Sequence, residues 1–341
     1  MNLKKSMSED KQLDLFNEEK RNKERTSIDR LFQDVKQYRN SSEFRKKLEF
    51  YTNFPYLGVY NAALVEQQRP GARFVLTAEK WKDEYNRKIR SNARPVIILL
   101  PFYPVEFLFD ISDTKQIDKT RKVDENIIIE QIINHHLASC KSDVSFYMKN
   151  LRENLPKYGI HYNTDYQVGS EMRAEIRLDQ SEKIYVRVHK DRYVAHHSHF
   201  VISVSSRADE VEQLTKILHE LGHLFCHHLA YPWWKDRFYT REEKEFEAET
   251  VSYLVAKRLG ISTPSIEYLS NYVDKKGNIP SILINRVFEA VDFIEQLVKE
   301  PRDVTKCLLY KKDEAFKEKV DKEKELIKQE QVKIKANKKS F

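Results

Sequence analysis

Residues 214–223 read Leu-Thr-Lys-Ile-Leu-His-Glu-Leu-Gly-His, and the last five of them decide which chemistry this chain can perform. They lie in a stretch, 209–229, whose apolar residues recur at helical spacing. Positions four apart share one face of a helix, so the imidazoles of His219 and His223 can bind one metal ion. Glu220 can then reach a water molecule on that ion. The motif predicts a zinc centre on a helix.

Two histidines leave such a centre incomplete. A zinc site that does chemistry has three protein ligands and keeps one position open for water. Some forms of this motif carry a Gly and a His three and six residues after the second His, but here Cys226 and Leu229 occupy those places. We therefore expect a carboxylate from the next predicted helix, 241–259. That helix offers Glu242, Glu243, Glu245, Glu247 and Glu249.

Glu245 and Glu249 lie four residues apart on one face of this helix, and the small Ala248 lies between them. We predict Glu245 as the third ligand and Glu249 as the residue that orients a ligand by a hydrogen bond. The reverse assignment, with Glu249 as the ligand, stays open. Mn²⁺ or another divalent ion could also replace Zn²⁺ in a site of two histidines and one carboxylate.

Other histidines follow the motif or precede it. His227 and His228 could donate a hydrogen bond to a developing oxyanion, although a role in ending the helix is the favoured interpretation. His196, His197 and His199 form a local cluster before a predicted strand. A second metal site there is an alternative to histidines with a purely structural role. For residues 219–223, the alternative to a metal site is a charged, partly buried pair of helices whose histidines have a structural role.

The composition excludes several classes of protein. The chain has 341 residues, 40% of them hydrophobic and 33% charged, and a net charge of +7. This is enough apolar material for about two domains, but no apolar run approaches the roughly 20 residues of a membrane-spanning helix. The start of the chain lacks the apolar core of a secretory signal, and three scattered cysteines fit a reducing, cytoplasmic location. Seven glycines form no nucleotide-binding loop.

We expect an α+β protein of two domains in five segments: a flexible arm at 1–25, a first domain at 26–120, connecting helices at 121–155, a second domain at 156–310 and a charged helical tail at 311–341. In the first domain, helices are expected at 26–35, 44–51, 60–66 and 78–85, and strands at 73–77, 96–100 and 105–109. In the second domain, strands are expected at 171–178, 183–189 and 199–205, and helices at 209–229, 241–259, 264–273 and 281–299.

The first domain carries a basic cluster with aromatic residues nearby. Cations could meet the phosphates of a single strand of DNA while exposed rings stack on its bases. The alternative for Trp81 is a place in the core, which is usual for a single Trp on an otherwise polar helix. The candidate DNA-binding residues are Arg87, Lys88, Arg90, Arg94, Trp81 and Tyr60.

Two parts of the chain resemble known families. The segment 209–272 resembles zinc metallopeptidases of the ImmA/IrrE type, through residues 214–223, the pair His227-His228 and the run Glu-Phe-Glu-Ala-Glu that begins at Glu245. In that family the Glu three residues before the Ala is the third ligand, which supports Glu245. The segment 60–113 is similar to the N-terminal domain of ArdC antirestriction proteins, through Tyr-Asn-Ala-Ala-Leu-Val-Glu-Gln-Gln-Arg-Pro at 60–70, Trp81, Arg-Pro-Val-Ile-Ile-Leu-Leu-Pro at 94–101 and Phe-Asp-Ile-Ser-Asp-Thr at 109–114.

The resemblance implies a single-stranded-DNA-binding domain followed by a zincin-like peptidase domain with a small sheet. The predicted function is therefore zinc-dependent cleavage of a protein substrate, such as a DNA-associated regulator, without a nucleotide cofactor. A second hypothesis is an antirestriction protein that binds single-stranded DNA and whose metal site is structural or vestigial. A third is a scaffold whose Lys/Glu-rich tail contacts partners.

Overall fold

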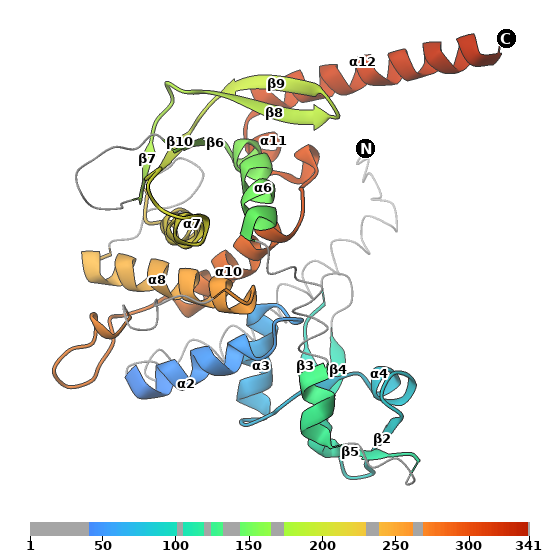
Figure 1. Ribbon diagram of the computed structural model, residues 1–341, viewed down its shortest axis with the longest axis vertical. Helices are drawn as coiled ribbons and strands as arrows, with labels where there is room; N and C mark the ends of the chain where they lie inside the picture. Colours follow the sequence, from blue (N-terminus) through green and yellow to red (C-terminus); the bar gives the residue numbers. More distant parts are fainter. Residues whose placement is uncertain are drawn as a thin grey trace, which may run out of the picture. The chain divides into compact units, whose positions relative to one another are not determined.

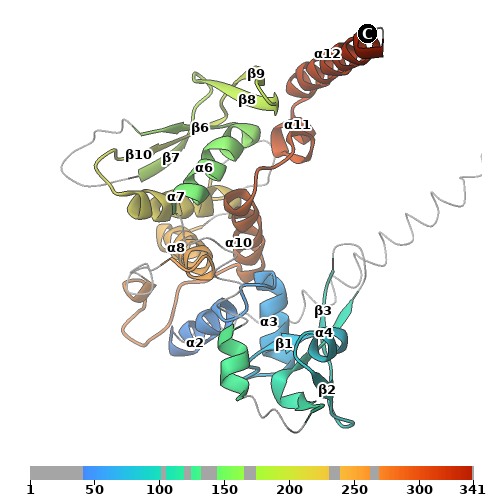
Figure 2. The ribbon, with the colours of Figure 1, turned by 45° about the vertical axis from the view of Figure 1, so that its right-hand side comes forward.

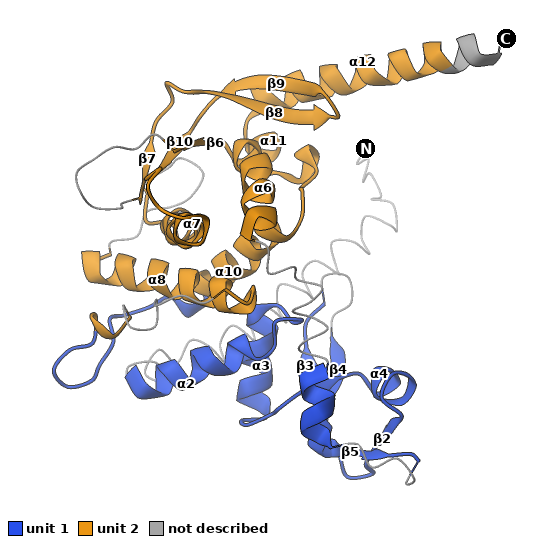
Figure 3. Cartoon of the chain, viewed as in Figure 1, with its two compact units in different colours: residues 1–131, 273–285 blue, residues 132–272, 286–341 orange. Residues whose placement is uncertain are grey.

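The structure is a computed structural model that describes residues 41–100, 105–118, 124–131, 144–164, 174–229, 239–261 and 269–339. They belong to two compact units (Figure 3). The first unit lies within residues 1–131 and also includes 273–285, and the second comprises 132–272 and 286–341. The expectations for the arm 1–25, the helix at 26–35 and the first half of the helix at 264–273 lie outside the described residues.

The first unit combines short helices with short strands (Figure 1). Its elements are α2 (Ser41–Thr52), α3 (Val59–Gln68), β1 (Val75–Leu76), α4 (Ala78–Asp83), β2 (Arg87–Ile89), β3 (Val96–Ile98), β4 (Glu106–Asp110), a 3-10 turn (Ile111–Asp113) and β5 (Thr114–Gln116). Strand β4 pairs antiparallel with both β1 and β3, and β2 pairs antiparallel with β5. Trp81 of α4 is fully buried in this core, where its indole N–H donates to the carbonyl of Phe109 at 2.8 Å.

The second unit is built on a three-stranded sheet. Its strands are β6 (Ile160–Asn163), β7 (Ala174–Leu178) and β10 (Phe200–Val204), in the order β6-β10-β7. All five residues of β10 are buried, as expected for a continuous apolar run in a central strand. β6 runs parallel to β10 and β7 runs antiparallel to it. A separate hairpin consists of β8 (Lys183–His189) and β9 (Arg192–His197).

The described helices of this unit are α6 (Val144–Asn154), α7 (Glu210–Phe225), α8 (Arg241–Arg258), α10 (Ile284–Lys299), α11 (Leu308–Lys312) and α12 (Glu314–Lys339). Helix α7 packs against β7 and β10 of the sheet, whereas α12 packs against the β8–β9 hairpin. Figures 1 and 2 both show α7 between the sheet and α8. Capping fixes where the two central helices begin: Asp209 accepts from the N–H of Glu212, and Thr240 forms a reciprocal capping box with Glu243.

The mixed helix and strand content agrees with the expected α+β class. Four strands were not expected: β2, β5, β6 and β9. The first three have only three or four residues, and β9 has no clean alternation of apolar and polar side chains. Helix α7 ends at Phe225, four residues before the expected end. Among the described residues, no helix is both long enough and apolar enough to cross a membrane.

Candidate functional site

Three donor atoms from α7 and α8 converge in the second unit. The Nε2 atoms of His219 and His223 lie 3.1 Å apart. One carboxylate oxygen of Glu245, Oε2, lies 3.4 Å from the Nε2 of His219 and 3.6 Å from the Nε2 of His223. The three atoms form a triangle with nearly equal sides, so a single ion could contact all of them.

The size of this triangle fits a small tetrahedral metal ion. Ligand atoms bound to zinc at about 2.0–2.1 Å with tetrahedral angles lie about 3.3 Å from one another. The observed separations of 3.1, 3.4 and 3.6 Å bracket that value. The donor set, two imidazole nitrogens and one carboxylate oxygen, is also one that zinc uses. The residues present therefore fit a divalent ion such as Zn²⁺.

Glu249 fixes the orientation of the first histidine. Its Oε2 lies 3.0 Å from Nδ1 of His219, on the other side of the ring from Glu245. A carboxylate only accepts hydrogen bonds, so Nδ1 carries the proton and donates it. In the neutral ring, Nε2 then presents its lone pair to the centre of the triangle. Of the two glutamates considered as third ligand, Glu245 faces both Nε2 atoms and Glu249 does not.

A second chain of contacts orients His223. The Nδ1 of His223 lies 2.9 Å from Nδ1 of His228, and the Nε2 of His228 lies 3.0 Å from a carboxylate oxygen of Glu247. Since Glu247 accepts, His228 donates through Nε2 and accepts through Nδ1. His223 must then donate through Nδ1, which leaves its Nε2 lone pair directed at the triangle. Both imidazoles thus present the tautomer that a metal ion requires.

The end of α7 brings His228 into this position. The N–H of His227 donates to the carbonyl of Leu224, and the N–H of His228 donates to the carbonyl of His223 at 2.9 Å. These two bonds are those of a Schellman motif. His227 takes the left-handed conformation that the motif needs, with φ of 64°. The chain turns back sharply, so the ring of His228 lies beside that of His223.

The electrostatics of the site favour a positive charge at its centre. Burial alone lowers the pKa of His219, but hydrogen bonds to the carboxylates of Glu245 and Glu249 raise it to about 10. When His219 and His223 carry a proton on Nε2, they donate hydrogen bonds to Glu245 and hold the pKa of its carboxyl well below its usual range. Burial and the nearby Lys244 lower the pKa of His228 to about 3, so this ring is neutral at pH 7.

Glu220 lies next to the two histidines and is almost buried, with 9% of its surface exposed. Burial raises the pKa of its carboxyl, although the imidazoles of His219 and His223 and a hydrogen bond from the backbone N–H of Ile176 act in the opposite direction. Ile176 belongs to β7, which is the outer strand beside β10 in the sheet of the described residues. The carboxylate of Glu220 is therefore close both to the histidines and to a strand edge.

The ring of His228 has a role other than the expected oxyanion contact, whereas an oxyanion contact by the ring of His227 stays a prediction. Both ring nitrogens of His228 are engaged, by His223 and by Glu247, so the ring has no N–H left for an oxyanion. The backbone of His227 ends the helix, which was the favoured interpretation. Sequence reasoning missed Glu247 as the partner of His228. Its spacing with Val251 and Leu254 on the buried face of α8 was a usable signal for a buried carboxylate.

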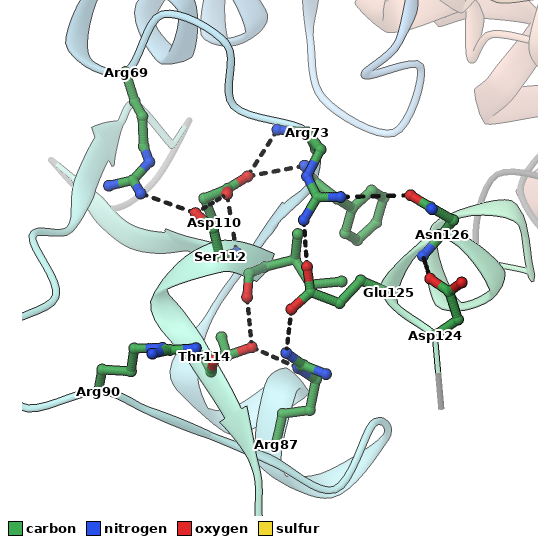
Figure 4. Close-up of polar contacts among 12 residues, drawn as sticks. Arg69, Arg73, Arg87, Arg90, Asp110, Ser112, Thr114, Asp124, Glu125 and Asn126 are labelled. Carbon is green, nitrogen blue, oxygen red and sulfur yellow. Dashed lines mark hydrogen bonds and ion pairs between the residues drawn. The ribbon is translucent and has the colours of Figure 1, made fainter. Parts of the chain in front are cut away.

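Two of the residues predicted to bind DNA are unavailable for it. Trp81 is fully buried in the core of the first unit and cannot stack on a base. Arg87 is 4% exposed, and its guanidinium donates to Thr114 at 2.5 Å and to Glu125 at 2.9 Å (Figure 4). Tyr60 is half-buried, whereas the other three cations are exposed on the described surface: Lys88, Arg90 and Arg94.

Arg87 is unavailable to DNA because it belongs to a network of arginines and carboxylates that stabilises this unit. Glu125, at the start of a helical segment, pairs with both Arg87 and Arg73. Arg90 donates to the backbone carbonyl of Thr114 at 3.0 Å, and Arg69 donates to the hydroxyl of Ser112 at 3.0 Å (Figure 4). Arg69 also pairs with Asp113. Basic residues close together in the sequence are thus partly structural. DNA binding by the exposed cations stays a prediction.

Comparisons with known proteins agree with the second unit being a peptidase-like domain. Over 279 residues, 72% of its length, the chain is 24% identical to an uncharacterized protein of Bacillus anthracis. That match covers 46% of the relative, so the chain spans about half the length of the curated protein it matches. No solved structure matches the chain. Residues 178–277, which contain α7, α8 and the converging donors, match the IrrE N-terminal-like domain, peptidase family M78.

Proposed function

We propose that this protein is a zinc-dependent metallopeptidase of the ImmA/IrrE type, in which His219, His223 and Glu245 hold the ion and Glu220 moves the proton. The convergence of the three donor atoms, with separations of 3.1–3.6 Å, carries this proposal. The match of residues 178–277 to a peptidase family supports it. When bound, the ion supplies the Lewis acidity that activates water and polarises a peptide carbonyl.

Glu220 acts as the general base and then as the general acid. It accepts a proton from the attacking water and delivers that proton to the amine that leaves as the peptide bond breaks. Burial raises the pKa of its carboxyl above the ordinary value, which suits a group that must both accept and donate a proton. Its contact with Ile176 supports a proton transfer beside the edge of β7, along which an extended peptide would lie.

The surrounding hydrogen bonds hold the two histidines ready for the ion. Glu249 fixes the ring of His219, and the pair His228–Glu247 fixes the ring of His223. Such partners set the tautomer and raise the basicity of a ligand. The substrate is a protein, and the resemblance to ImmA/IrrE peptidases makes a DNA-associated regulator the class to examine first.

The experiment compares new protein N-termini in a soluble bacterial extract treated with the wild type, Glu220→Gln or Glu242→Gln. Glu220→Gln keeps all three donors, so we expect normal zinc content and at least a 10²-fold loss of cleavage. Glu242→Gln, at an exposed position of α8, should cleave like the wild type. Cleavage products that are the same for the wild type and Glu220→Gln contradict the proposal. So does a zinc-loaded wild type that generates none, the result expected if the metal were structural.

A further inference from the structure

We propose that the second unit holds a second divalent cation, bound by His196, His199 and Asp313, that joins the β8–β9 hairpin to the start of α12. One donor atom from each of these residues lies within 4.8 Å of the other two. The Oδ2 of Asp313 lies 3.1 Å from Nε2 of His196 and 3.6 Å from Nε2 of His199. These distances again bracket the roughly 3.3 Å that separates ligand atoms on tetrahedral zinc.

The fold holds both imidazoles in place. His196 lies in β9, and its ring meets the edge of Phe316 at a centroid distance of 5.2 Å. His199 follows three residues later, where its backbone N–H donates to Gly159 at 2.7 Å. Gly159 has φ of 73°, and a β-carbon there would approach Cδ2 of His199 to 2.5 Å. Only glycine at this turn therefore admits the ring of His199 in its observed position.

Asp313 is fixed through its other oxygen. Its Oδ1 accepts a hydrogen bond from the N–H of Phe316 at 2.8 Å, which caps the first turn of α12. Oδ2 is thereby directed at the two histidines. Lys319, whose charge acts on His196, donates to the carbonyl of Ala195 at 3.3 Å.

An ion at this position would add a cross-link to an apolar contact. The hairpin and the C-terminal helices share a small core, and Phe316 in it lies against His196. Arg192 extends the contact by pairing with Glu323 and Glu330 of α12. Two imidazoles and one carboxylate are a donor set for Zn²⁺, with water in the fourth position. None of these ligands lies on α7 or α8, so the two sites can be removed separately.

The test uses the full-length, untagged chain in which His219→Ala and His223→Ala remove the first site. After chelator treatment, this protein is titrated with Zn²⁺ in a calorimeter and melted with and without the ion. We expect one zinc per chain and a rise of several degrees in Tm. Adding Asp313→Asn should abolish both effects. The amide oxygen of Asn can still cap α12, so this variant should retain its fold.

A second variant and a matched control complete the design. His196→Ala should lose the zinc as Asp313→Asn does. His197→Ala, at the exposed neighbour between the two ligands, should bind it unchanged. The proposal is overturned if the His219→Ala, His223→Ala protein binds no zinc, or if its zinc survives Asp313→Asn and His196→Ala. Because the first site is absent throughout, neither result depends on the proposed peptidase activity.

Discussion

The backbone of Gly222 lies directly against the backbone of Ala248. A β-carbon at residue 222 would come within 3.0 Å of both the Cα and the carbonyl oxygen of Ala248. The small residues thus let α7 and α8 approach to backbone contact in the middle of the site. Glu245 and Glu249, on either side of Ala248 in the sequence, can reach His219 because of this approach.

Gly222→Val should push the two helices apart and weaken metal binding. Overpacking of this kind costs about 1–3 kcal/mol of stability, and the carboxylate of Glu245 would move away from the histidines. We expect zinc affinity, measured by competition with a chelator, to fall at least tenfold. Val211→Ala, at an exposed position of the same helix, should leave the affinity unchanged. An unaltered affinity in Gly222→Val would show that the close approach of the helices is not needed.

His228→Ala should reduce zinc affinity by about 10–100-fold, because His223 loses the partner that sets its tautomer. Glu247→Gln should also reduce zinc affinity. The N–H₂ of the amide can donate to Nε2 of His228, so that His228 carries its proton on Nδ1 and His223 can no longer donate to it. The adjacent His227→Gly is the control: glycine accepts the left-handed φ of 64° readily, so zinc binding should be retained. Equal zinc affinities in His228→Ala and His227→Gly would show that His228 does not set the tautomer of His223.

Glu295→Gln should destabilise the second unit by about 3–5 kcal/mol, because it leaves the guanidinium of Arg258 buried without its counter-ion. Arg258 is fully buried, and its Nε donates to Glu295 at 2.5 Å. Burial acts to raise the pKa of Glu295, but Arg258 and Lys299 lower it overall. Urea unfolding at neutral pH measures the loss of stability.

The same pair predicts a pH dependence. The pKa of Glu295 is lower in the folded state than in the unfolded state. Its contribution to the free energy of unfolding is therefore fully present above the pKa of the unfolded carboxyl, about 4.3. It is lost as the pH falls through the lower, folded pKa. The difference in unfolding free energy between the wild type and Glu295→Gln should therefore shrink as the pH drops below about 4. A difference that stays constant with acid would contradict this assignment.

Arg87→Met should lower the unfolding free energy of the first unit by about 1–3 kcal/mol, because Thr114 and Glu125 lose a buried hydrogen-bonding partner. Lys88→Met, at the exposed neighbour on β2, should change stability by less than about 0.5 kcal/mol. Thermal unfolding of the full chain distinguishes the two variants. If both variants are equally stable, the contacts of Arg87 with Thr114 and Glu125 do not stabilise the first unit.

Much of the second unit could be predicted from the sequence, because its signals are local. The spacing of His219 and His223 fixes their shared face, and the spacing of Glu245 and Glu249 does the same on the next helix. From the sequence, either Glu245 or Glu249 could be the third ligand, and only the packing of α7 on α8 distinguishes them. In the structure, Glu245 lies beside both Nε2 atoms and Glu249 behind the ring of His219.

The features that sequence reasoning missed depend on contacts between distant segments. Asp313 joins His196 across more than a hundred residues, and no local pattern connects them. His228 reaches Glu247 only because a Schellman motif turns the chain at residue 227. Arg87 looked like a free cation because its partner, Glu125, lies far along the chain. Local periodicity carries no information about such pairs.

The most direct test of the central claim is the zinc content of the purified full chain, measured by mass spectrometry for the wild type, Glu245→Gln and Glu249→Gln. We expect Glu245→Gln to contain one zinc ion per chain fewer than the wild type. Glu249→Gln should keep that ion with lower affinity, because only the orientation of His219 is affected. If Glu245→Gln keeps the zinc content of the wild type, or if Glu249→Gln alone loses the ion, Glu245 is not the third ligand.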